Sequence, residues 1–269
     1  MTDADIKDWD DAYANGAHVP GSAAYPDMWA SAAETFRAGW ANKALDVAYG
    51  ASDRQKLDLF HPEGTSKGLV IFVHGGYWLR FDKSFWSHFA AGALQCGWTV
   101  ALPSYDLAPT VGIGDITRQI ESAIMAAAER QDGPVRLAGH SAGGHLVTRM
   151  VCDNSPLDAK TMGRLENVVS ISGLHDLRPL RRTSMNDSFS LSEAAAEEES
   201  PALRTRKANC TVTAWVGAAE RPEFVRQSRL LCEAWPGTRL HVEPDRHHFD
   251  VIDALKDPES QLVRTLLSA

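Results

Sequence analysis

The chain has 269 residues, enough for one large domain or two small ones, and 44% of its residues are hydrophobic. Its net charge of −8 argues against nucleic-acid binding, which calls for a basic surface. No apolar run approaches a membrane span, and the acidic start, Met1 to Asp5, lacks the apolar core of a signal peptide. We therefore expect a cytoplasmic globular protein without nucleic-acid or membrane partners, and leave open whether it forms a homodimer.

Cysteine and histidine spacing does not suggest a metal. The four cysteines lie apart from one another in apolar or helical surroundings, so we expect free thiols: Cys96, Cys152, Cys210 and Cys232. Four histidines cluster in two short stretches, but their spacing fits no standard zinc pattern: His140, His145, His247 and His248. We expect neither a metal nor another cofactor.

The first part of the chain changes character near residue 41. Residues 1–41 are alanine-rich with aromatic side chains at helical spacing, which predicts a helical N-terminal extension. Residues 45–49 and 56–60 then alternate apolar and polar side chains, with Gly50 and Asp53 between them. This alternation predicts an antiparallel hairpin at the start of a sheet.

Strand-like and helix-like patterns alternate through the rest of the chain. Continuous apolar runs occur at residues 68–73, 98–102, 135–138, 167–171 and 211–216. Helical patterns lie between them, at about 83–96, 113–131, 141–152 and 224–235. A strand at 239–243 and a C-terminal helix complete the pattern. We predict an α/β fold in one domain, 1–269, whose mostly parallel sheet has helices on both faces.

Residues 181–200 interrupt this alternation. The segment contains Arg181 and Arg182, then a run of glutamates, and ends before Pro201. It is either a solvated insertion with a short helix or a small cap over an active site.

Ser141 lies in the most informative motif, Gly139-His140-Ser141-Ala142-Gly143. An apolar strand precedes this Gly-x-Ser-x-Gly pattern and a helical pattern follows it, which is the order of a nucleophile elbow. The two glycines permit a turn too tight for larger side chains. The motif predicts a hydrolase with an activated serine.

A serine nucleophile needs a base, and the base needs an orienting acid. In hydrolases with this elbow, the chain order is serine, acid, histidine. Glu220 is the first carboxylate after the strand at 211–216, with Glu223 and Asp176 as alternatives. Between the neighbouring His247 and His248, we favour His248 as the base, because a helix is expected from residue 250 onward.

The oxyanion formed in such a reaction needs backbone N–H donors. Ala142 supplies one, because it follows the nucleophile and opens a helix. The loop His74-Gly75-Gly76-Tyr77-Trp78 is of the His-Gly-Gly type, and Gly76 and Tyr77 are the further donor candidates. His140 is expected to line or support the site. Trp78, with Tyr77 and Phe81, could stack against an aryl group or simply pack around the loop.

These motifs together resemble the kynurenine formamidase (arylformamidase) branch of the α/β-hydrolases, and bacterial esterase-like members more than animal ones. The likeness covers residues 45–255 and includes Ser172 to Leu177 and His248 to Ile252. Animal and fungal members carry aspartate where Glu220 stands here. The resemblance implies an α/β-hydrolase fold and a carboxylesterase or arylformamidase activity.

The implied substrate is a small carboxylic ester or an aryl formamide such as N-formylkynurenine, cleaved through an acyl-enzyme. An amino-acid substrate also needs a partner for its carboxylate, for which Arg80, Arg181 and Arg182 are candidates. Two other classes remain open. One is a binding protein on a hydrolase scaffold, and the other is a lyase or transferase that uses the same triad.

Overall fold

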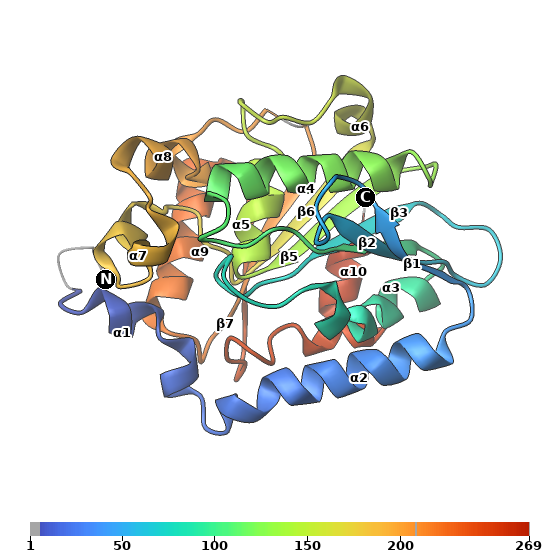
Figure 1. Cartoon of the computed structure of the whole chain (residues 1–269), viewed down its shortest axis with the longest axis horizontal. Coiled ribbons are helices and arrows are strands. Elements are labelled where there is room, and N and C mark those ends of the chain that lie inside the picture. The colour runs from blue at the N-terminus through green and yellow to red at the C-terminus, as the bar shows by residue number, and fades with distance from the viewer. Residues whose placement is uncertain (1–5, 208, 269) are drawn as a thin grey trace.

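A central eight-stranded sheet organises the computed structural model, which describes residues 6–207 and 209–268 (Figure 1). The strand order is β1-β2-β4-β3-β5-β6-β7-β8. The strands are β1 (Lys43–Ala48), β2 (Lys56–Phe60), β3 (Leu69–Val73), β4 (Thr99–Pro103), β5 (Val135–His140), β6 (Leu165–Ile171), β7 (Thr211–Gly217) and β8 (Arg239–Glu243).

The sheet combines an antiparallel edge with a parallel body. β1 pairs with β2, and β2 with β4, in antiparallel register. From β4 to β8 all neighbouring strands are parallel. The predicted α/β fold, with its antiparallel N-terminal hairpin and mostly parallel sheet, is confirmed.

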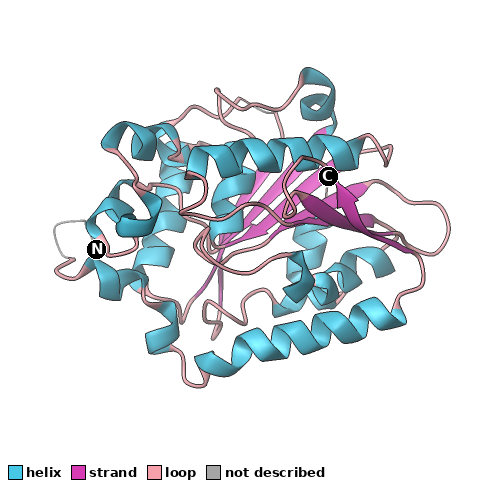
Figure 2. Ribbon diagram, viewed as in Figure 1, coloured by secondary structure: helices cyan, strands magenta, loops and turns pink. Residues whose placement is uncertain are grey.

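Helices cover both faces of this sheet (Figure 2). They are α1 (Trp9–Tyr13), α2 (Tyr25–Gly39), α3 (Ala91–Gln95), α4 (Ile113–Ala128), α5 (Ala142–Arg149), α6 (Ala159–Arg164), α7 (Asn186–Phe189), α8 (Glu193–Glu198), α9 (Pro222–Ala234) and α10 (Gln261–Leu267). Among the described residues, no helix has both the length and the apolar character needed to cross a membrane.

Strand β3 shows why helices cover both faces of the sheet. All five of its residues are buried. Because side chains alternate along a strand, Leu69, Ile71 and Val73 enter the core beneath α4, α5 and α9, whereas Val70 and Phe72 enter the core beneath α2, α3 and α10. A continuous apolar run is the pattern that such a strand requires.

Two predicted helices are shorter or more irregular than their patterns indicated. The segment expected as a helix at 83–96 consists of 3₁₀ turns at Lys83–Phe85 and Ser87–Ala90 before α3, with Asp82 Oδ1 accepting from the Ser84 N–H at 2.7 Å. The helix expected from residue 250 is a series of turns and a 3₁₀ segment, Asp253–Lys256. Pro258 ends it, because the residue before a proline favours extended backbone.

The described part of the N-terminal extension, residues 6–41, is largely helical and packs against the rest of the structure, whereas residues 1–5 lie outside the described residues. α1 and 3₁₀ turns at Asn15–His18 and Ser22–Ala24 lead into α2, which packs along the 3₁₀ turns of residues 83–90. Residues 181–200 contain α7 and α8. Because both segments pack on the sheet's helical layers, we infer that the chain forms one domain.

Candidate active site

Ser141 occupies a sharp turn between β5 and α5. Its φ and ψ are 54° and −116°, a conformation that non-glycine residues adopt at a cost of about 1–3 kcal/mol. The Ser141 N–H donates to the Ile171 carbonyl at 2.8 Å, and the Ser141 carbonyl accepts from the His145 N–H at 3.2 Å. The serine is thereby held at the carboxyl end of the central strand.

Close backbone contacts explain the glycines around this turn. A β-carbon on Gly139 would lie 2.1 Å from the Gly143 carbonyl oxygen, and one on Gly143 would lie 1.9 Å from the Val73 oxygen. A β-carbon on Gly75 would lie 3.0 Å from Cβ of Ser141. The first two positions cannot hold a larger residue unless the elbow moves.

His248 and Glu220 are joined by a buried hydrogen bond. The Nδ1 atom of His248 lies 2.7 Å from Oε2 of Glu220, and the carboxylate must be the acceptor. The other carboxylate oxygen accepts from the Ser172 hydroxyl at 2.5 Å and from the Gly217 N–H at 2.8 Å. With Nδ1 protonated, Nε2 of neutral His248 is free to accept a proton.

The alternative acids have other partners. Glu223 is fully buried, accepts from the Tyr13 hydroxyl at 2.8 Å and pairs with Arg226. Asp176 pairs with Arg178 at 2.8 Å. Glu220 is therefore the carboxylate that the fold brings to His248.

The neighbouring His247 has other partners and does not line the cavity. Its Nε2 lies 3.2 Å from the Tyr25 hydroxyl, and its Nδ1 lies 3.2 Å from Oδ1 of Asp250. His248, by contrast, lines the same cavity as Ser141.

Three consecutive residues of the predicted oxyanion loop have left-handed backbone. The φ angles are 116° at Gly76, 53° at Tyr77 and 56° at Trp78. The Gly76 carbonyl accepts from two N–H groups of the following turn, which fixes the direction of that peptide. Within residues 6–207 and 209–268, the N–H groups of Gly76, Tyr77 and Ala142 have no hydrogen-bond partner. Such unpaired donors are what an oxyanion site requires.

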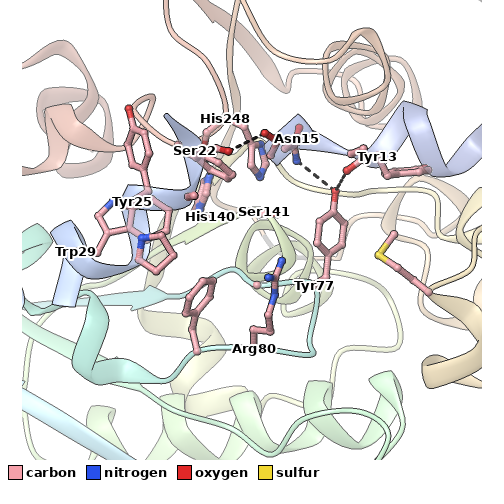
Figure 3. A pocket seen from close by; sticks show the side chains of 18 of the residues that line it. Tyr13, Asn15, Ser22, Tyr25, Trp29, Tyr77, Arg80, His140, Ser141 and His248 are labelled. Carbon is pink, nitrogen blue, oxygen red and sulfur yellow. Dashed lines mark hydrogen bonds between the residues drawn. The ribbon is translucent and has the colours of Figure 1, made fainter. Parts of the chain in front are cut away.

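A cavity of about 460 Å³ opens beside Ser141 (Figure 3). A third of its lining residues are Phe, Tyr or Trp: Tyr13, Tyr25, Trp29, Tyr77, Phe81, Trp86 and Phe249. Nearly half of the lining residues come from positions 10–29 of the N-terminal extension. From the segment considered as a cap, 181–200, Ser184 and Met185 line the cavity. The N-terminal extension thus covers more of the site than that insertion does.

His140 lines this cavity. Its Nε2 donates to the His248 carbonyl at 2.8 Å, and the two rings lie 4.7 Å apart. Burial, together with the charge that His248 can carry, holds the pKa of His140 well below its ordinary value. A neutral His140 therefore supports the backbone of His248.

Trp78 does not line the cavity, so its predicted role in substrate binding is wrong. The side chain is fully buried and packs edge-on against His145 at 5.2 Å and Phe189 at 5.8 Å. The left-handed backbone at Trp78 turns its ring toward the core beneath α5. The packing alternative considered for the aromatic residues of this loop applies here, whereas Tyr77 and Phe81 do line the cavity.

Of the three arginines considered as carboxylate partners, Arg80 alone lines the cavity. Arg181 pairs with Glu193 at 3.8 Å, and Arg182 lies 5.0 Å over the Trp9 ring. The Arg80 guanidinium lies 5.8 Å from the centre of the Phe81 ring, and in the part of the chain that the structure describes it has no carboxylate partner.

The site can be compared with known proteins. A family model described as an alpha/beta hydrolase fold matches residues 70–231, more than half of the chain. The chain belongs to the α/β-hydrolase family. This α/β hydrolase is 29% identical over 243 residues to the kynurenine formamidase of Salmo salar, covering 85% of this chain and 82% of the fish protein. The kynurenine formamidase of Danio rerio is 29% identical over 236 residues, covering 83% and 80%.

Solved structures give a nearer relative of this α/β hydrolase. A protein from Silicibacter sp. named as a "putative thioesterase" is 53% identical, with a TM-score of 0.94, over 96% of this chain and 98% of that one. Esterase B of Lactobacillus rhamnosis has a TM-score of 0.67 at 20% identity, over 91% and 93% of the two chains. This second likeness supports the fold alone.

Several residues of the site were not predicted from the sequence of this α/β hydrolase. Ser172 holds the Glu220 carboxylate, and Tyr13, Asn15, Tyr25 and Trp29 line the cavity. These N-terminal residues lie in helical segments, and the spacing of their side chains predicts only amphipathic packing. The aromatic side chains of this segment were a signal in the sequence that it packs against something. They did not indicate that it contacts residues 76–81.

Proposed function

We propose that the chain is a serine hydrolase that cleaves a small carboxylic ester or an aryl formamide through an acyl-enzyme on Ser141. The observation that carries this proposal is the buried Glu220–His248 hydrogen bond at the edge of the cavity that Ser141 lines. The hydrolase fold and the kynurenine formamidase relatives support the same reaction class.

The proposed reaction begins when Ser141 Oγ bonds to the substrate carbonyl carbon and its proton passes to Nε2 of His248. Glu220 stabilises the imidazolium. The carbonyl electrons move to oxygen, where the N–H groups of Gly76, Tyr77 and Ala142 receive the charge. The tetrahedral adduct then breaks its bond to the amine or alcohol, and this leaving group takes the proton from His248.

Deacylation repeats these steps with water. Water bonds to the acyl carbon and transfers its proton to His248. The second adduct expels Ser141 Oγ, which recovers the proton. For N-formylkynurenine, the products are formate and a free aryl amine.

The cavity favours an aromatic leaving group. Tyr77, Phe81 and Phe249 offer ring faces and edges, and about 460 Å³ accommodates a substituted benzene ring with a short chain. Arg80 supplies a cation for a carboxylate on that chain. These features support an aryl formamide of the kynurenine type over an aliphatic ester.

Thioester hydrolysis is the second candidate function. The 53% identical relative is named as a thioesterase, and the same serine chemistry cleaves a C–S bond. A short acyl thioester therefore belongs in the substrate comparison.

The test compares kcat/KM for N-formylkynurenine, p-nitrophenyl acetate and a short acyl thioester, with wild type and Ser141→Ala. We expect the formamide to give the highest value and Ser141→Ala to lower kcat by roughly a million-fold. Near-normal turnover by Ser141→Ala would overturn the proposal. A fluorophosphonate probe distinguishes a binding protein, which would not be labelled at Ser141, and product analysis distinguishes a transferase.

A further inference from the structure

The Tyr77 side chain joins the oxyanion loop to the N-terminal extension. Its hydroxyl donates to the Tyr13 carbonyl at 2.7 Å and accepts from Nδ2 of Asn15 at 3.2 Å. Figure 3 shows both bonds at the wall of the cavity, with Tyr77 rising from the loop toward residues 13 and 15. Tyr77 thus contributes a backbone N–H that has no hydrogen-bond partner among the described residues, and a side chain that contacts a distant segment.

The N-terminal segment that receives this bond is itself fixed. The Tyr13 hydroxyl donates to Oε1 of buried Glu223 at 2.8 Å and accepts from Nε2 of Gln227 at 3.2 Å. Nearby, the Arg221 side chain donates to the carbonyl of Asp11 at 3.2 Å. α1 is therefore attached to α9, which begins directly after the loop that carries Glu220. Tyr77 is bound to a rigid support.

The oxyanion loop needs such a support. Tyr77 and Trp78 both have left-handed backbone, which is unfavourable for residues other than glycine and persists only where surrounding contacts impose it. Trp78 is held by packing and by the bond from the Ala108 N–H to its carbonyl at 2.9 Å. Tyr77 is less completely buried than Trp78, and its phenol hydroxyl makes the two hydrogen bonds to the N-terminal extension.

We propose that the Tyr77 phenol, with Tyr13 and Asn15, is a positioning device that fixes the Gly76 and Tyr77 N–H groups toward the oxyanion. The N-terminal extension is then part of the catalytic apparatus. This inference rests on the proposed function, since it assigns those N–H groups to the transition state. Burial first, and then the charges of Glu220 and Glu223, raise the pKa of Tyr77 far above its ordinary value, so the phenol remains a donor.

The test is Tyr77→Phe, which removes the hydroxyl and keeps the ring. We expect kcat for an aryl ester to fall about 10- to 100-fold and KM to stay within about twofold of the wild-type value. This decrease in kcat is somewhat smaller than the decrease caused by removing an oxyanion donor completely. The specific readout is the ratio of kcat/KM for the ester to that for its thionoester. Sulfur accepts hydrogen bonds weakly, so this ratio should fall about tenfold. Asn15→Ala should also lower kcat for the ester and the ester-to-thionoester ratio, each by a smaller factor.

Tyr49→Phe is the matched control, because Tyr49 also donates a hydroxyl to a backbone carbonyl, that of Ser104, and does not line the cavity. It should lower the melting temperature without changing the ester-to-thionoester ratio. If Tyr77→Phe and Asn15→Ala fold and keep the wild-type ratio, the positioning role is wrong. If wild type shows no hydrolysis that depends on Ser141, the proposed function itself fails.

Discussion

Glu220 and His248 form a hydrogen bond of 2.7 Å, and their side chains are 0% and 4% exposed. The other Glu220 oxygen is occupied by Ser172 and Gly217, so the carboxylate cannot turn away. In Glu220→Gln, an amide N–H facing Nδ1 would force the His248 proton onto Nε2, which could then not accept the Ser141 proton. We expect kcat to fall about 10⁴-fold, as measured by steady-state kinetics.

Asp176→Asn is the control for this change. Asp176 is also buried but pairs with Arg178 instead of a histidine. Its replacement should cost stability and leave kcat within a few-fold of wild type. A comparable loss of kcat in both variants would mean that Glu220 has no special relation to His248.

Gly143→Ala should prevent normal folding or abolish activity. The new methyl group would lie 1.9 Å from the Val73 carbonyl oxygen, and both atoms belong to rigid elements. Gly163→Ala is the matched change in α6, where a methyl group meets no atom within 4 Å. It should raise the unfolding free energy by about 0.5–1 kcal/mol, since alanine favours the helix. Urea denaturation of both variants tests the pair, and equal stabilities would contradict the close contact at the elbow.

Arg80→Gln should separate charged from neutral substrates. Arg80 supplies a cation at the cavity, and its guanidinium lies 5.8 Å from the centre of the Phe81 ring. We expect KM for N-formylkynurenine to rise about tenfold or more, because a charge-assisted hydrogen bond is lost, with little change for p-nitrophenyl acetate. Arg181→Gln, which alters a pair with Glu193 outside the cavity, is the control. Equal effects of Arg80→Gln on both substrates would exclude a carboxylate contact.

The unfolding free energy should fall as the pH is lowered from about 6.5 to about 4. Burial lowers the pKa of His74 and of His145 to about 4, and that of His175 to about 3. The unfolded chain, with ordinary histidines, binds protons more readily in this range, so acid favours unfolding. Each such histidine contributes up to about 1.4 kcal/mol per pH unit.

Urea denaturation at pH 7, 6 and 5 measures this slope. His175→Gln should flatten it, because it removes one of the buried imidazoles whose pKa is lowered. An unfolding free energy that stays constant between pH 7 and 5 would show that these imidazoles are not kept neutral by burial.

Strong local patterns made much of this molecule predictable. The run at residues 69–73 identified a strand covered on both faces, and Gly139 to Gly143 identified the sharp turn, because each pattern has few structural solutions. The order of Ser141, Glu220 and His248 along the chain then suggested which loops meet at one edge of the sheet. The fold prediction is confirmed, and the catalytic roles of these residues remain predictions.

Contacts between distant segments were not predictable in the same way. The orientation of Trp78 depends on its left-handed backbone, which propensities do not specify. The placement of Tyr13 and Asn15 beside Tyr77 depends on how α1 packs against α9. Helical spacing indicates that a segment has an apolar face, but it does not indicate which surface that face covers.

The attachment of α1 also affects how the protein matures. Tyr13 leaves the ribosome early, but its partner Glu223 is synthesised 210 residues later. Because so long a loop closes slowly, the attachment of α1 to α9 forms late, after α9 itself has formed. During synthesis and refolding, the sheet can therefore assemble before the pocket has its N-terminal wall. Recovery of enzyme activity should lag behind recovery of secondary structure.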